Sequence, residues 1–389
     1  MIKNSIYYSP TKMYFGEGEE NNIGNIINEY GYKNILIIYG KSSVVKSGLL
    51  DKITNQLVNV SYKLKGGVEP NPKVSFVVEA NEEFKNENFD LILAVGGGSV
   101  IDTAKGIAAT FNGQLDPIKV LKREIEIKKF IPVATVLTLS ASGSEFSSSC
   151  VLSELSIGMK QGMTHDSLRP VFSIMNPTLT CSVSKFQTAN GIVDIMMHTL
   201  ERYFDPIYSF DFTNELSIGL IKTVYENGKK AIENPNDYEA RANLMICGAF
   251  SHNDLTNIGI TRNLRVHVLE HAVSALKDEV SHGEGLAVLF IAWAKVMKEY
   301  HKIKMAPLAQ RLFNVDSKLS IDEQADLFIS KLQEFFISIG MSSKLSQLNF
   351  IESDLEVLTN MATKDNTRPI SDAKPLDNDL VYKIYKEAF

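Results

Sequence analysis

Residues 91–109 read LILAVGGGSVIDTAKGIAA, in which an apolar run is followed by glycines and then by a helical pattern. The run Leu91–Val95 predicts a buried strand, and the glycines permit a tight turn into a helix that begins near Val100. Ile35–Tyr39 (ILIIY) predicts a second strand, followed by the turn GKSS and an amphipathic helix through Leu49–Leu57. Strands that alternate with helices in this way are typical of a parallel sheet.

This alternation continues to about residue 182 and then stops. Two more apolar runs predict strands before that point, at Ile131–Val136 and at VFSIM, which ends at Asn176-Pro177. Beyond it, amphipathic patterns predict long helices, for example over Gln187–Tyr203, Glu239–Ala249 and Gly283–Tyr300. We therefore predict an α/β nucleotide-binding domain with a Rossmann-like parallel sheet over residues 1–181 and an all-helical domain over residues 182–389.

The composition is that of a globular protein and excludes several functions. The 389 residues are 44% hydrophobic and 22% charged, and the net charge of -6 comes without any dense Lys/Arg block, so nucleic acid is not expected as a partner. No apolar run reaches membrane-spanning length, and the N-terminus lacks the apolar core of a signal peptide. The three cysteines are Cys150, Cys181 and Cys247, and they form no CxxC pair. This pattern favours a reducing compartment, so we expect a cytoplasmic protein.

The glycine turn after Leu91–Val95 predicts a phosphate site. Glycine lets the backbone approach an oxyanion closely, and the amides at a helix N-terminus favour negative charge. A pyrophosphate would therefore fit at Gly96, Gly97, Gly98 and Ser99. The alternative, a tight turn in which Ser99 or Asp102 caps the helix, stays open.

A second turn, after the strand Ile35–Tyr39, is expected beside the adenosine ribose of a cofactor. A carboxylate there would accept a hydrogen bond from the 2′-hydroxyl of NAD, whereas a cation and hydroxyls suit the 2′-phosphate of NADP. The turn consists of Gly40, Lys41, Ser42 and Ser43. It holds a lysine and two serines but no acidic residue, which favours NADP(H). A solvated surface lysine is the alternative for Lys41.

Ligand-type side chains gather in the helical half. Asp194 and His198 are four residues apart, as are His267 and His271, so each pair lies on one face of its helix, and His282 follows in an HG turn. One carboxylate with imidazoles suits a divalent first-row metal, although a lone buried histidine is more often a core residue. Such a metal would stabilise an alkoxide or polarise an aldehyde while a nicotinamide carries the hydride.

Several motifs in order along the chain resemble the iron-containing (group III) alcohol dehydrogenases, in the branch of NADP-dependent butanol dehydrogenases and broad-range aldehyde reductases. They are YYSPTKMYFGEG, GVEPNP, GGGSVIDTAK, TVLTLSASGSE, DIMMHTLE, HVLEH, HGEGLAVL and TRPI. The resemblance implies an α/β nucleotide domain, a helical domain and often a homodimer. It also implies a divalent metal, iron most of all and zinc as an alternative, on Asp194, His198, His267 and His282, with His271 near the substrate as a proton relay.

The resemblance also implies a cofactor site. It places the pyrophosphate at Gly97, Gly98, Ser99 and Asp102, and the adenosine half near Thr138, Ser142 and Lys160, with a further contact from Asn71. Lys41 stands where NAD-preferring relatives carry Asp, which again favours NADP(H). The expected function is hydride transfer between NADP(H) and a small primary alcohol or aldehyde.

Two departures from the family pattern bear on this hypothesis. The segment between His271 and His282 has one residue more than in butanol dehydrogenases, and Arg262 and Arg265 replace smaller or aromatic residues. The arginines leave a polar or anionic substrate open, unless they face solvent or pair with a carboxylate. A polyol dehydrogenase, a dehydroquinate-synthase-like lyase and a nucleotide-binding protein without catalysis remain as other functions.

Overall fold

The computed structural model describes all 389 residues and divides them into two compact units. Residues Tyr8–Ser182 form one unit, whereas Val183–Phe389 form the other together with the first seven residues, Met1–Tyr7. The short N-terminal segment is held there by the backbone, since Lys3 N donates to Gly259 O over 2.8 Å. The sequence had assigned this segment to the nucleotide-binding domain, because nothing in its pattern shows which unit it contacts.

The α/β unit is built on a six-stranded parallel sheet in the order β1-β8-β5-β4-β2-β3. Four of its strands were predicted to within about two residues at each end: β2 (Asn34–Gly40), β4 (Leu91–Gly96), β5 (Val133–Leu137) and β8 (Phe172–Met175). The edge strands are β1 (Lys12–Phe15) and β3 (Ser61–Val68), and β8 (Phe172–Met175) pairs with β1. The predicted fold class is confirmed for this unit.

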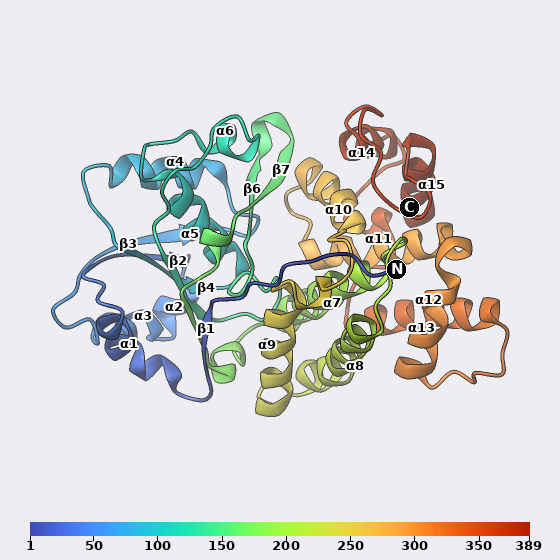
Figure 1. Ribbon diagram of the computed structural model, residues 1–389, viewed down its shortest axis with the longest axis horizontal. Helices are drawn as coiled ribbons and strands as arrows, with labels where there is room; N and C mark the ends of the chain where they lie inside the picture. Colours follow the sequence, from blue (N-terminus) through green and yellow to red (C-terminus); the bar gives the residue numbers. More distant parts are fainter. The chain divides into compact units, whose positions relative to one another are not determined.

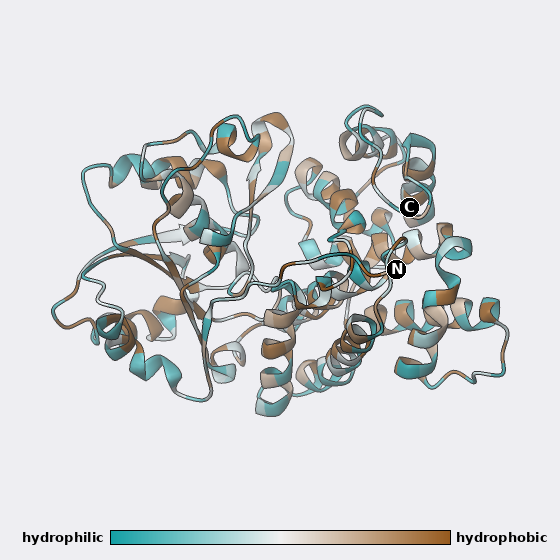
Figure 2. Ribbon diagram, viewed as in Figure 1, coloured by the Kyte–Doolittle hydropathy of each residue, from teal (hydrophilic) through white to brown (hydrophobic).

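Helices cover both faces of the sheet (Figure 1). One face carries α1 (Ile23–Glu29), α2 (Ser43–Lys46) and α3 (Leu49–Thr54), and the other carries α4 (Val74–Glu83), α5 (Gly98–Thr110) and α6 (Pro117–Leu121). Because both faces are covered, β4 is buried and apolar along its whole length and β2 is so from Ile35 to Ile38, and Figure 2 colours such hydrophobic residues brown.

The order of the strands predicts where a ligand would bind. After β2 the chain moves outward to β3, and it then returns to the other side of β2 to form β4 and β5. Ligands of doubly wound sheets bind at the carboxyl ends of the two strands between which the order reverses. Here these strands are β2 and β4, and the turn with Lys41 and the glycine turn follow them directly.

A two-stranded antiparallel hairpin was not predicted. It consists of β6 (Ser149–Glu154) and β7 (Met159–Thr164), joined through Gly158 in the left-handed conformation. The serine-rich sequence before it hides the strand pattern. The hairpin pairs with the GVEPNP segment, since Ser153 N donates to Pro72 O over 2.8 Å.

The second unit contains no strand, as predicted. Its helices are α7 (Lys185–Tyr203), α8 (Asp211–Glu233), α9 (Tyr238–His252), α10 (Arg265–Leu276), α11 (His282–Val296), α12 (Lys298–Phe313), α13 (Ile321–Ser338), α14 (Asp354–Thr363) and α15 (Asn378–Ala388). The single helix predicted over Gly283–Tyr300 is wrong, because Met297 leaves helical geometry (φ -100°, ψ 10°) and separates α11 from α12. None of the helices is long and apolar enough to cross a membrane.

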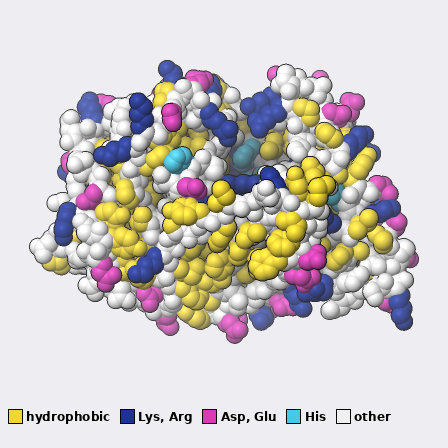
Figure 3. Space-filling view, in the orientation of Figure 1, with side chains coloured by type: hydrophobic (Ala, Val, Ile, Leu, Met, Phe, Trp, Pro, Cys, Tyr) yellow, Lys and Arg dark blue, Asp and Glu magenta, His cyan; other side chains and the backbone are white.

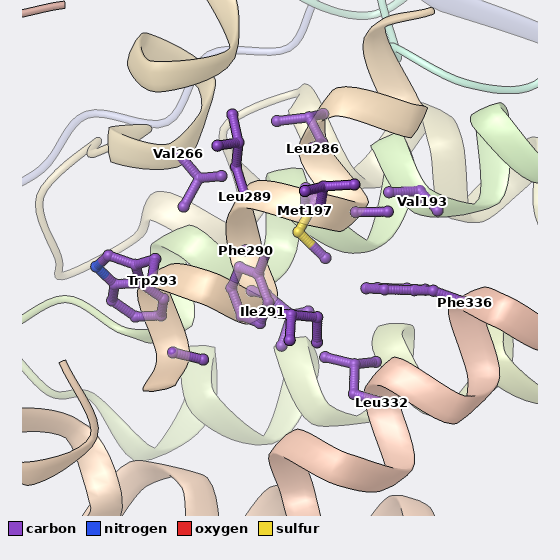
Figure 4. Close-up of a cluster of buried hydrophobic side chains, with 14 of the residues drawn as sticks. Val193, Met197, Val266, Leu286, Leu289, Phe290, Ile291, Trp293, Leu332 and Phe336 are labelled. Carbon is purple, nitrogen blue, oxygen red and sulfur yellow. The ribbon is translucent and has the colours of Figure 1, made fainter. Parts of the chain in front are cut away.

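Helix α11 forms the centre of the helical core. Its side chains Phe290 and Trp293 are fully buried and lie among residues of α7, α10 and α13, as Figure 4 shows. The indole Nε1 of Trp293 donates to Asp372 Oδ2 over 2.8 Å, so its one polar atom is satisfied. This packing holds the first turn of α11, which carries His282, in place.

The face of the protein drawn in Figure 3 carries acidic and basic side chains side by side.

Candidate metal centre and nucleotide-binding loops

Helix α7 presents the first two predicted ligands. Asp194 and His198 lie one turn apart on its buried face, with exposed fractions of 5% and 4%. The carboxylate oxygen Oδ1 of Asp194 is 3.5 Å from Nδ1 of His198. The four-residue spacing therefore aims both donor atoms at one place, as the sequence indicated.

Helices α10 and α11 bring the other two. Nε2 of His267 lies 3.6 Å from Oδ1 of Asp194, and Nε2 of His282 lies 3.8 Å from the same oxygen. Residues 277–281 join Leu276, where α10 ends, to His282 at the start of α11. All four predicted ligands therefore converge on one carboxylate oxygen.

The donor atoms at this point suit a divalent cation. Asp194 Oδ1, His198 Nδ1 and His267 Nε2 are each buried without a hydrogen-bond partner, and such orphaned atoms are costly unless an ion satisfies them. Their separations suit ligands that each lie about 2.0–2.2 Å from a shared ion. Burial, with the nearby His267 adding to it, lowers the pKa of His198 well below its usual value and keeps this ring neutral, as a ligand must be.

Two carboxylates that the sequence reasoning missed support the ligands. Glu201 Oε1 contacts Nδ1 of His267, and Glu270 Oε2 contacts Nδ1 of His282. Burial alone would lower the pKa of His267, but the Glu201 and Asp194 carboxylates outweigh it and raise this pKa to about 9. A signal was present in the sequence, because an H-x-x-E pattern occurs in both HTLE and HVLE.

The HGEG motif is explained by close packing of α11 on α7. A Cβ on Gly283 would lie 2.3 Å from the backbone oxygen of Asn190, so only glycine fits there. The side chain of Asn190 in turn accepts a hydrogen bond from Glu284 N over 2.9 Å. Together these contacts seat the N-terminus of α11, and with it His282, against α7.

The neighbouring basic residues differ in their surroundings. Arg265 is fully buried, donates to Phe204 O and lies 3.5 Å from Asp372, so it belongs to the helical core and not to a substrate site. Arg262 is partly exposed and lies 3.8 Å from Asp254. The ring of His271 is 5.9 Å from that of His282 and outside the group around Asp194.

In the α/β unit, the glycine turn packs tightly. Gly97 is the N-cap residue of α5, and no side chain caps this helix, so the capping alternative for Ser99 and Asp102 does not describe this turn. A Cβ on Gly98 would lie 2.4 Å from the hydroxyl of Ser142, which brings this predicted cofactor residue against the turn. Thr138, which follows β5, donates from its backbone N to Gly96 O over 3.1 Å, so the end of β5 also lies beside the glycine turn.

Asp102 is turned toward the protein itself. Its carboxylate accepts from Ser144 Oγ over 2.6 Å and from Val151 N over 3.0 Å. One turn further along α5, the buried Lys105 donates to the backbone oxygens of Ser144, Ser147 and Ser149. These two residues fasten the serine-rich loop beside the glycine turn.

Two further predicted cofactor residues, Lys160 and Asn71, lie close together, and a third, Lys41, pairs with an acidic residue. Nζ of Lys160, on β7, is 3.3 Å from Oδ1 of Asn71. Lys41 forms an ion pair with Glu69, with its Nζ 2.6 Å from Oε1, and both side chains are more than half exposed. The turn therefore has an acidic neighbour after all, supplied by the end of β3, which sequence distance concealed.

Comparison with known proteins gives the family. Residues 10–177 match the family model for iron-containing alcohol dehydrogenase, and residues 188–389 match that for the C-terminal part of the Fe-containing alcohol dehydrogenase family. The chain is 36% identical to NADH-dependent butanol dehydrogenase A of Clostridium acetobutylicum, covering 98% of this chain and 99% of that one. It is 30% identical to the NADPH-dependent aldehyde reductase YqhD of Escherichia coli, with full coverage of both.

A solved structure agrees. The crystal structure of NADH-dependent butanol dehydrogenase A from Thermotoga maritima superposes with a TM-score of 0.94 at 31% identity, over 100% of this chain and 99% of that chain. The family and the enzyme class predicted from the sequence are thereby confirmed. The chain belongs to the iron-containing alcohol dehydrogenase family, in the branch of butanol dehydrogenases and aldehyde reductases, and is an NAD(P)-dependent alcohol oxidoreductase.

Proposed function

We propose that this enzyme interconverts small primary aldehydes and alcohols with NADP(H) at a divalent metal held by Asp194, His198, His267 and His282. The observation that carries the proposal is the convergence of the ligand atoms on Asp194 Oδ1, three of them buried and without a hydrogen-bond partner. Two relatives support the substrate class, since one is named a butanol dehydrogenase and the other an aldehyde reductase.

The residues of the chain have separate tasks in this proposal. When bound, the metal polarises a carbonyl oxygen and the nicotinamide carries the hydride. Asp194 supplies the one negative charge among the ligands, and the imidazoles would bind in their neutral form, so that His267, whose pKa is about 9 without the cation, would release a proton on binding. His271 is our candidate for moving a proton to or from the substrate oxygen, because it lies beside His282 and is partly exposed. Asp102 shapes the serine-rich loop beside the pyrophosphate turn.

Mixing the enzyme with NADPH and butanal is expected to consume NADPH only while the metal is present. A chelator should slow turnover by at least about a hundredfold, because the metal supplies several kcal/mol of charge stabilisation, and added Fe²⁺ or Zn²⁺ should restore it. Absorbance of the reduced cofactor is the measurement. Turnover that a chelator leaves unchanged, after metal analysis has confirmed removal, would contradict the proposal. Faster oxidation of glycerol or 1,2-propanediol than of butanol would favour a polyol dehydrogenase.

We propose that NADP(H) is preferred through Lys41, Ser42 and Ser43, and that Glu69 limits the preference. The ion pair with Glu69 competes with a 2′-phosphate for the charge of Lys41. The same carboxylate is a candidate acceptor for the 2′-hydroxyl of NAD. Relatives of both kinds exist, since the butanol dehydrogenase is named NADH-dependent and the aldehyde reductase NADPH-dependent.

Two variants with opposite expected effects test this preference. Lys41→Ala should lower kcat/KM with NADPH about tenfold, the size of one charged hydrogen bond, and Glu69→Gln should raise it by releasing Lys41 from its pair. The value with NADH should change less in the lysine variant. Cofactor ratios from initial rates give the answer, and an unchanged ratio in both variants would remove the pair from the specificity.

Three finer statements also belong to the proposal. Likeness to the family supports iron as the metal in the cell, with zinc as a substitute, and a homodimer, and the isolated cysteines support a cytoplasmic location. A lyase that acts on an anionic substrate would need a cluster of basic residues at the substrate site. Arg265 is fully buried and cannot belong to such a cluster, so it does not support the lyase hypothesis.

A further inference from the structure

Two helices of the metal centre, α7 and α10, each carry a glutamate three residues after a ligand histidine. Glu201 follows His198 on α7, and Glu270 follows His267 on α10. Neither glutamate pairs with the histidine of its own motif. Each contacts a ligand on another helix of the site: Glu201 contacts His267 on α10, and Glu270 contacts His282 at the start of α11.

Both carboxylates are completely buried, and each has a second donor. The exposed fraction is 0% for Glu201 and for Glu270. Val266 N donates to Glu201 Oε2 over 2.6 Å, and the hydroxyl of Ser274 donates to Glu270 Oε1. A buried carboxylate is costly unless its oxygens are occupied, so these contacts fix the rotamer of each side chain.

The contacts decide which ring nitrogen of each histidine faces the centre. In both pairs the carboxylate takes Nδ1, and Nε2 is the atom directed at Asp194. An imidazole whose Nδ1–H donates a hydrogen bond to a carboxylate keeps that proton and presents a lone pair at Nε2, and the nearby negative charge makes Nε2 a stronger donor to a cation.

Glu270, His271 and His282 form a second set of residues that could hold a metal ion, and the same contacts account for their closeness. Their ligand atoms lie within 4.8 Å of one another. However, both oxygens of Glu270 are already engaged, one by Ser274 and one by Nδ1 of His282. The short spacing reflects the support of a ligand and not a separate site.

We propose that Glu201 and Glu270 are positioning residues of the metal centre, each holding the Nδ1–H of one ligand imidazole on the neighbouring helix and strengthening its bond to the cation through Nε2. The inference rests on the proposed metal centre. Because each glutamate links two helices, the arrangement joins α7, α10 and α11 into one ligand framework.

The affinity of the metal-free protein for Zn²⁺, measured by competition with a chromophoric chelator, tests the proposal. Glu270→Gln and Glu201→Gln keep the shape of the side chain but remove its charge, and each is expected to raise the dissociation constant for Zn²⁺ about 10- to 100-fold. With Co²⁺ in place of Zn²⁺, the visible absorption bands should move to longer wavelength, because less basic imidazoles give a weaker ligand field. A merely structural role would leave these bands unchanged in the folded protein.

Glu20→Gln is the matched control. Glu20 is also a buried carboxylate, 3% exposed, with two partners in Lys52 and Asn176, but it belongs to the α/β unit. This variant is expected to lower thermal stability while its zinc affinity stays within about twofold of the parent. Zinc affinity within twofold of the parent in both Glu201→Gln and Glu270→Gln would overturn the inference.

If the variants do not fold, the unmodified zinc-loaded enzyme still decides. Nitrogen-15 NMR of its histidines should place the retained proton of His267 and His282 on Nδ1, and a proton on Nε2 would overturn the inference. The two levels of the argument fail differently. A parent enzyme that binds no divalent metal overturns the proposed centre and the positioning roles together, whereas a parent that binds tightly with unaffected variants overturns the positioning roles alone.

Discussion

Asp194→Ala is expected to abolish metal retention and to lower kcat by at least about a thousandfold, the scale seen when an electrostatic stabiliser of the transition state is lost. All other ligand atoms are within 3.5–3.8 Å of the Oδ1 that this substitution removes. The three remaining ligands are neutral imidazoles, so no charge would be left among them to balance the cation. Elemental analysis of the purified variant and its initial rate with butanal give the two measurements.

Asp211→Ala serves as the control for Asp194→Ala. Asp211 is an exposed aspartate at the start of α8 and contacts none of the ligands. Its variant should keep a full complement of metal and the parent rate. If Asp194→Ala retained stoichiometric metal while circular dichroism showed it folded, the assignment of this carboxylate as a ligand would be refuted.

Gly283→Ala is the second substitution with a large expected effect. The added Cβ would lie 2.3 Å from Asn190 O, which is backbone and cannot move aside by changing a rotamer. We expect the free energy of unfolding to fall by about 1–3 kcal/mol, the usual cost of overpacking, and zinc affinity to fall because the first turn of α11 carries His282. Urea denaturation of the metal-free protein and the chelator competition measure the two effects separately.

Gly219→Ala is the matched control, with an expected effect of opposite sign. Gly219 lies inside α8, and a Cβ there would meet nothing within 4 Å. Alanine favours a helix over glycine by about 0.5–1 kcal/mol, so this variant should be as stable as the parent or more so. Equal denaturation midpoints for Gly283→Ala and Gly219→Ala would show that the contact with Asn190 is unimportant.

The sequence predicted best what depends on neighbours along the chain. The strands β2, β4 and β5 are continuous apolar runs, and the four-residue spacing of Asp194 and His198 places both on one helical face. The breaks and edges were harder to predict. The helix break at Met297 involves neither proline nor glycine, and β6 and β7 are rich in serine and other polar residues.

Contacts between distant segments could not be predicted. The proximity of Glu69 to Lys41 follows from the pairing of β2 with β3, which no local pattern encodes. The same holds for Glu201, whose partner lies on another helix, although the repeated H-x-x-E spacing offered a clue. Arg265 shows the converse, since its charge left a substrate contact open, and its ion pair with Asp372 agrees with the alternative that it pairs with a carboxylate.

The assignment of Met1–Tyr7 to the helical unit has a consequence for how such genes recombine. The helical unit consists of two stretches separated by the whole α/β unit, so a single crossover near residue 183 would exchange only part of it. A chimaera made in this way would combine the amino-terminal segment of one parent with the helices of the other. The hydrogen bond from Lys3 N to Gly259 O and that from Ser209 N to Met1 O use only backbone atoms, so they survive such a mismatch of side chains.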